Sequence, residues 1–127
     1  MSCATCSIAA AAPLTSAIYA FDRRRVSGTP SESAETGPEF NRKVEEVEAM
    51  EARIAIRLGE NEPAAVSYRE ARRCLQELRA LVFEAGESWT PEQEGRGNDL
   101  RAQVATHRSD YLKQARKLVN PEARSDA

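Results

Sequence analysis

Aromatic residues, cysteines and histidines are scarce in this sequence. Aromatic side chains make up 6% of its 127 residues, and there are three cysteines and one histidine. A hydrophobic core must therefore be built mainly from Ala, Val, Leu and Ile. Three cysteines do not make a disulfide scaffold in a chain of this size, so a reducing, intracellular compartment is expected. The net charge of −2 lacks the basic excess of nucleic-acid-binding proteins, and we expect no nucleic-acid partner.

Long hydrophobic runs are also missing. The apolar run from Ile8 to Phe21 is shorter than the roughly 20 residues that cross a bilayer, so no direct membrane span is expected. It contains Pro13 and no basic residue precedes it, which argues against a secretory signal peptide. We expect a cytoplasmic protein, which could act on the cytosolic face of endomembranes.

Residues 1–37 are mostly Ala, Ser, Thr, Pro and Gly, a composition that predicts a disordered tail. The same segment has few acids and contains Arg23, Arg24 and Arg25, so an organelle transit peptide is the alternative. Its apolar run could also dock on a partner. The sequence leaves these interpretations open.

Residue patterns that carry catalysis or bind cofactors are hard to find. Cys3 and Cys6 have the spacing of a zinc or redox pair, but no second pair or nearby histidine completes a metal site. His107 falls on a predicted helix seam, where an imidazole at the edge of the core is the simpler interpretation. No phosphate-binding glycine loop or Ser/His/Asp pattern occurs. We therefore expect no enzyme, no cofactor and no metal.

Helical periodicity dominates the rest of the chain. Thr36 and Glu39 predict a capping box for a first helix, which Gly59 ends. Its apolar stripe consists of Phe40, Val44, Val47, Ile54 and Leu58. Asn61 predicts the N-cap of a second helix that ends at Gly86. Its seam consists of Ala64, Tyr68, Ala71, Leu75, Leu78, Val82 and Ala85.

A third helix is expected to begin after Asn98. Thr90 to Gln93 also has the form of a capping box, but Gly95 and Gly97 follow too soon for a stable helix, so we predict a turn there. The third seam consists of Leu100, Val104, His107, Tyr111, Gln114 and Leu118.

These three seams predict an all-α fold, an antiparallel three-helix bundle over residues 38–120, between a tail at 1–37 and a disordered tail at 121–127. The alternating spacing of four and three residues is typical of shallow, coiled-coil-like packing. Side chains beside the seams are the candidates for a partner-binding surface, although flanking residues often only widen the core or form a solvated face. They are Met50, Ile56, Arg69, Arg72, Arg73 and Leu112.

The end of the second predicted helix, the loop after it and the start of the third contain Leu78, Leu81, Phe83-Glu84-Ala85, Pro91, Arg96-Gly97-Asn98 and Leu100-Arg101. In these residues the chain resembles the N-terminal three-helix domain of Qb-type vesicle-transport SNARE proteins, and the resemblance extends over about residues 40 to 119. No SNARE heptad helix or membrane anchor follows Asn120 in the sequence. The resemblance therefore implies the adaptor half of such a protein, which binds partners in vesicle transport and does not drive fusion.

A second resemblance lies in Gly59, Ala64, Tyr68-Arg69-Glu70-Ala71 and the stretch from Asp110 to Leu118. These residues resemble MIT domains, three-helix modules that bind tails of ESCRT-type proteins, although the loop before the third helix is too long for that family. It implies a groove between helices that receives a short helical peptide.

The function expected from the sequence is a non-enzymatic protein-interaction module, with an adaptor role in vesicle-mediated intracellular transport. The partner would be a helical segment of a SNARE, coat or ESCRT-type protein. The alternatives are an MIT-like peptide-binding module and a structural subunit of a larger assembly.

Overall fold

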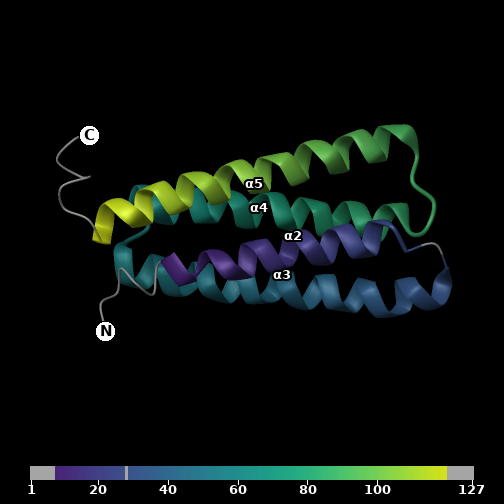
Figure 1. Cartoon of the computed structure of the whole chain (residues 1–127), viewed down its shortest axis with the longest axis horizontal. Helices are drawn as coiled ribbons and strands as arrows, with labels where there is room; N and C mark the ends of the chain where they lie inside the picture. Colours follow the sequence, from purple (N-terminus) through teal and green to yellow (C-terminus); the bar gives the residue numbers. More distant parts are fainter. Residues whose placement is uncertain (1–7, 28, 120–127) are drawn as a thin grey trace.

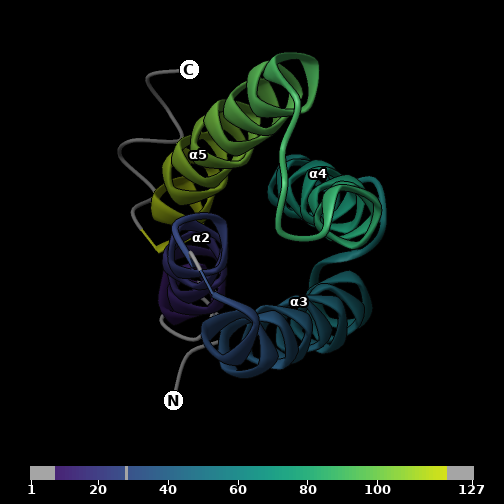
Figure 2. The ribbon, with the colours of Figure 1, turned by 90° about the vertical axis from the view of Figure 1, so that its right-hand side faces the viewer.

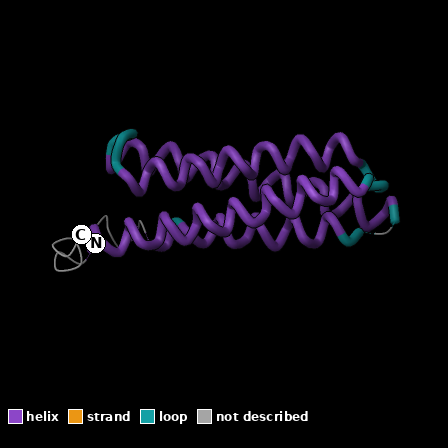
Figure 3. The backbone as a smooth tube through the Cα atoms, turned by 90° about the horizontal axis from the view of Figure 1, so that it is seen from above, coloured by secondary structure: helices purple, strands orange, loops and turns teal. Residues whose placement is uncertain are grey.

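The computed structural model describes residues 8–27 and 29–119, and within them all regular structure is helical. The helices are α2 (Ala11–Arg25), α3 (Pro30–Leu58), α4 (Pro63–Ala85) and α5 (Pro91–Val119). They run alternately up and down along one long axis (Figure 1). Short turns at the ends of the bundle join them (Figure 3). The all-α expectation is confirmed, but the described chain has four helices where three were expected.

Helix α2 is the main correction to the expected fold, because it lies in the segment assigned to a disordered tail. Its buried side chains form one broad face: Ala11, Leu14, Ala17, Ile18, Ala20, Phe21 and Arg24. Ala has the highest helix propensity, and burying a Leu, Ile or Phe side chain contributes roughly 1.5–3 kcal/mol each. Pro13 does not break this helix, because it falls in the first turn, where backbone N–H groups have no intrahelical acceptor. The expected boundary at residue 38 is therefore wrong.

Polar contacts fix α2 against the neighbouring helices. Arg101 of α5 donates two hydrogen bonds to the Asp22 carboxylate, each 2.7 Å long. Arg23 forms an ion pair with Glu39 of α3. Burial of one face therefore combines with charged contacts at its edges to hold this short helix in place.

The predicted tail at 121–127 and the Cys3/Cys6 pair lie outside the described residues.

Helix α3 begins earlier than the capping-box pattern predicted. Thr29 is the N-cap, and its hydroxyl accepts a hydrogen bond from the Glu32 backbone N–H at 3.2 Å. Pro38 lies inside the helix, although it has no N–H to donate to the preceding turn and costs roughly 3 kcal/mol in a helix interior. The hydroxyls of Thr36 and Ser27 are 2.8 Å apart, so this stretch of α3 is held against the end of α2. Burial of Phe40 and Val44 in the core, together with this contact, outweighs the unfavourable proline.

The predicted seams of α3 and α4 agree with the structure. Phe40, Val44, Val47 and Ile54 are the buried residues of α3. Every residue of the predicted α4 seam from Ala64 to Val82 is buried, with Leu78 fully inaccessible. Gly59 and Gly86 end the two helices with φ values of 92° and 62°, a region that glycine adopts at little cost. At the start of α4 the N-cap is Glu62, without a side-chain cap bond, and not Asn61.

Helix α5 begins at the Thr90 capping box, so the turn predicted there is wrong. The Thr90 hydroxyl accepts from the Gln93 N–H at 3.1 Å, and the Gln93 side chain accepts from the Thr90 N–H at 2.9 Å. Gly95 and Gly97 are both helical. A Cβ atom at position 97 would lie 3.2 Å from Cζ3 of Trp89, so this glycine admits the indole ring. A glycine inside a helix lowers its stability by about 1 kcal/mol relative to alanine. Packing of the Trp89 ring against Gly97 compensates for this loss.

Viewed along the long axis, the helices form a ring in the order α2, α3, α4, α5 (Figure 2). Helix α2 contacts both α3 and α5 and so fills the gap that would lie between them. One continuous core joins all four helices. The apolar segment proposed as a docking element is therefore docked on its own chain.

Candidate functional site

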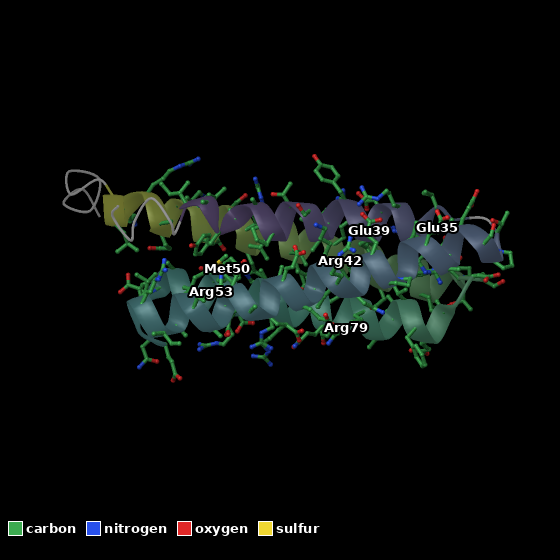
Figure 4. All side chains as sticks on the ribbon, turned by 90° about the horizontal axis from the view of Figure 1, so that it is seen from below. Glu35, Glu39, Arg42, Met50, Arg53 and Arg79 are labelled. Atoms are coloured by element: carbon green, nitrogen blue, oxygen red, sulfur yellow. The ribbon has the colours of Figure 1, made fainter. Side chains whose placement is uncertain are left out.

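An open groove lies between α3 and α4, beside the C-terminal end of α2; we refer to it as the α3/α4 groove. Its volume is about 650 Å³. Its lining residues are Arg24, Ser33, Gly37, Pro38, Asn41, Gln76, Arg79, Ala80, Val82, Phe83 and Gly86. Figure 4 views this side of the bundle, with Arg79 labelled on α4. A volume of this size is within the range of roughly 300–1,000 Å³ of binding pockets.

Arg24 forms the inner wall of the groove. It is in the last turn of α2 and is only 6% exposed. Its Nη2 atom donates to the Gly86 carbonyl oxygen at 2.8 Å, where α4 ends. The negative end of the α4 dipole stabilises the guanidinium there. Gly37 of α3 faces the same side chain, since a Cβ at this position would be 3.7 Å from Nε of Arg24.

Phe83 forms the apolar rim of the groove. Its ring is 90% exposed, the highest value among the large hydrophobic side chains described. Pro38 and Val82 add apolar surface beside it. An exposed phenyl ring next to a groove is a recurring feature of interaction surfaces, because partner contact removes its apolar area from water.

The polar side chains of the groove differ in whether another side chain pairs with them. Arg79 forms an ion pair with Glu48 at 3.5 Å. Arg24 has no carboxylate partner among residues 8–27 and 29–119. The buried Ser33 hydroxyl has no hydrogen-bond partner in the described part of the chain. The groove-lining residues include two arginines and no acid, so the groove suits an anionic group.

The six residues predicted as a partner surface differ in burial and in their contacts. Met50 and Leu112 are partly buried against the core, and Ile56 is 84% exposed on α3. The arginines all contact acidic residues or the backbone: Arg69 with the Glu60 carbonyl, Arg72 with Glu51 and Arg73 with Glu70. None of the six lines the α3/α4 groove.

Arg72 and Arg73 line a second, smaller pocket, in which α4 and α5 bring the sole histidine near a cysteine. His107 and Cys74 both line this pocket. The Cys74 thiol donates to Oε1 of Gln103 at 3.6 Å, and burial raises its pKa. A thiol with a raised pKa stays protonated at neutral pH and is a poor nucleophile. In the described residues no three His, Cys, Asp or Glu side chains form a potential metal site.

Neither Phe83 nor Arg24 was among the site residues predicted from the sequence. Phe83 is outside the α4 seam, and its signal was its position as an aromatic residue on the polar side of that helix. Arg24 belongs to a basic stretch in the segment predicted to be a tail. Once the stretch before it is recognised as a helix, Arg24 falls three residues after Phe21 and therefore on the buried face.

None of the described helices is long and apolar enough to cross a bilayer. A comparison with family models, curated proteins and solved structures finds no match for this chain.

Proposed function

We propose that this protein is a non-enzymatic protein-interaction module that receives a helical segment of a partner protein in the α3/α4 groove. The observation that carries the proposal is Phe83, a 90% exposed phenyl ring on the rim of an open groove. Aromatic side chains with a pocket beside them supply much of the binding energy at protein interfaces. A groove between two helices suits the docking of an amphipathic helix.

The resemblance to Qb-type SNARE N-terminal domains favours a partner from vesicle transport, and such a module would act on the cytosolic face of endomembranes. The MIT resemblance favours a short helical peptide of an ESCRT-type protein instead. In either case the occupant is a helix, so the groove is the surface to test first.

One observation counts against the alternative that the protein is a permanent structural subunit. That alternative assigned the apolar run from Ile8 to Phe21 to docking on a larger assembly. Leu14 and Phe21 are instead fully inaccessible within the bundle. Their burial favours a module that folds by itself and exposes the groove.

Site-specific photo-crosslinking in cells tests this proposal. A benzophenone side chain replaces Phe83 in one version of the full chain and Ile56 in another. Ile56 is a matched control, because it is 84% exposed on α3 and does not line the groove. We expect position 83 to crosslink one discrete protein, with the adduct on a helical segment, and position 56 to give no such adduct.

The affinity of that partner provides the second readout. Phe83→Ala should weaken its capture by roughly tenfold or more, since hot-spot aromatic residues contribute about 2 kcal/mol or more. Ile56→Ala should leave capture unchanged. Equal crosslinking from both positions, or equal capture by both variants, would show that the groove is not the interaction surface.

A further inference from the structure

The partner chemistry of the α3/α4 groove can be specified further from Arg24, an inference that rests on the proposed function. A guanidinium has five N–H donors and carries its charge at all physiological pH values. Arg24 is 6% exposed, and the one hydrogen bond that the structure gives it goes to the Gly86 carbonyl. Burying a charge is costly unless it is paired. Arg24 is thus a desolvated cation with donors left over.

Capping of α4 explains only part of this arrangement. The bond from Nη2 to Gly86 satisfies one carbonyl at the helix end. A neutral donor could make that bond without the cost of burying a charge. The other arginines of α2 have side-chain partners on neighbouring helices, Arg23 with Glu39 and Arg25 with Asn98. Among these three arginines, the most buried one is the one without a side-chain partner.

We propose that Arg24 binds a carboxylate of the partner, and that the partner segment is an amphipathic helix with an acidic residue about one turn from an apolar one. Arginine pairs with carboxylates through two parallel hydrogen bonds, a geometry that a lysine cannot reproduce. The unpartnered Ser33 hydroxyl lines the same groove and supplies another donor. The groove-lining residues contain no acid that would repel the carboxylate.

The apolar part of the ligand is inferred from the apolar side chains that line the groove. Pro38, Val82 and Phe83 line the groove together with Arg24. A ligand that fills it must therefore present apolar surface and negative charge side by side. On a helix, residues three or four apart share one face, which gives the acidic and apolar residues the required spacing.

A small probe isolates this chemistry from the rest of any partner. 3-Phenylpropionate carries a phenyl ring and a carboxylate, and 3-phenylpropionamide is its neutral analogue. Both are titrated into the ¹⁵N-labelled full chain while the Nε–H signal of Arg24 and the backbone signals of Gly37 and Gly86 are followed. We expect the acid to shift these three signals in a saturable manner and to bind roughly tenfold or more tightly than the amide.

Variants identify the cation that is responsible. Arg24→Lys keeps a positive charge but not the two parallel bonds, and should lose most of the preference for the acid. Arg79→Met is the matched control, because Arg79 lines the same groove but already pairs with Glu48, and should keep the preference. If Arg24→Lys fails to fold, the comparison of acid with amide on the unaltered chain still decides the question. Equal binding of the two probes, or shifts at other residues only, would overturn the proposal.

The two proposals can fail separately. A crosslinked partner at position 83 without acid preference at Arg24 would remove only the carboxylate site. A clear acid preference without a partner at position 83 would leave an anion site and remove the helix-binding function.

Discussion

Buried polar groups at the two ends of the bundle differ in whether they have hydrogen-bond partners. At the tyrosine end, formed by Tyr68, Tyr111 and Ala10, the two rings meet edge to face with centroids 4.9 Å apart. The Tyr68 hydroxyl donates to the Ala10 carbonyl oxygen at 2.9 Å, and burial raises its pKa, so it stays a protonated donor. Every part of this contact is enclosed within the bundle.

The arginine end, formed by Phe21, Arg24, Ser33 and Trp89, is less complete. Phe21 packs edge to face against Trp89 with centroids 6.2 Å apart. Ser33 Oγ and Trp89 Nε1 are buried, and neither has a hydrogen-bond partner among the described residues. Unsatisfied polar groups cost stability, and proteins tend to retain them where function needs them. The Tyr68 hydroxyl is thus paired at one end, whereas two buried polar atoms at the other end lack a partner among the described residues.

The largest expected effect comes from Phe21→Ala at the arginine end. Phe21 is fully inaccessible, so its truncation should lower the free energy of unfolding by about 3–5 kcal/mol. Phe83→Ala at the same end should change it by less than about 0.5 kcal/mol, because that ring is exposed. Chemical denaturation followed by circular dichroism measures both. A Phe21→Ala variant as stable as the unaltered chain would mean that α2 is not part of the core.

A smaller effect separates the two ends directly. Tyr68→Phe removes a hydroxyl with a partner and should destabilise the bundle by about 1 kcal/mol. Ser33→Ala removes a buried hydroxyl without a partner among the described residues and should be neutral or slightly stabilising. Thermal melts of the two variants under the same conditions make the comparison. Equal losses in both would contradict the difference between the ends.

The smallest effect concerns the glycines near the start of α5. Gly95→Ala should stabilise the protein by up to about 1 kcal/mol, because Ala is a better helix former and the added Cβ would meet no atom within 4 Å beyond its neighbours and the backbone of its own helix. Gly97→Ala should give no such gain, since its Cβ would lie 3.2 Å from the Trp89 ring. Denaturation midpoints measure both, with Trp89 fluorescence reporting movement of the ring. A gain at position 97 equal to that at 95 would show that the indole does not need the glycine.

Much of the fold could be predicted from periodicity. The seam of α4 is clear in the sequence because Tyr68, Leu75 and Leu78 are large apolar residues separated by charged ones. The ends at Gly59 and Gly86 were equally predictable, because glycine adopts positive φ at little cost. Helix α2 was missed because its stripe includes small Ala residues within a segment rich in Ser and Ala, so buried and exposed positions differ little in hydropathy.

The candidate site was less predictable than the fold. An unpaired buried Arg24 cannot be recognised from the sequence, because its burial depends on α3 and α4 closing over the end of α2. The predicted surface residues Arg69, Arg72 and Arg73 carry positive charge in the sequence, but Glu51, Glu70 and the Glu60 carbonyl contact them in the fold. Only the arrangement of helices decides which cation lacks a partner.

By itself the sequence determined that this chain is helical, where α3 and α4 end and which face of each turns inward, since helix propensity, glycine stops and apolar spacing are local properties. Tertiary structure alone decided that α2 joins the bundle, that α3 continues through Pro38 and that α5 begins at Pro91. In each case contacts from distant residues, Phe21 and Trp89 among them, outweigh a local preference of a few kcal/mol or less. The same long-range packing leaves Phe83 exposed and Arg24 buried beside it at the α3/α4 groove.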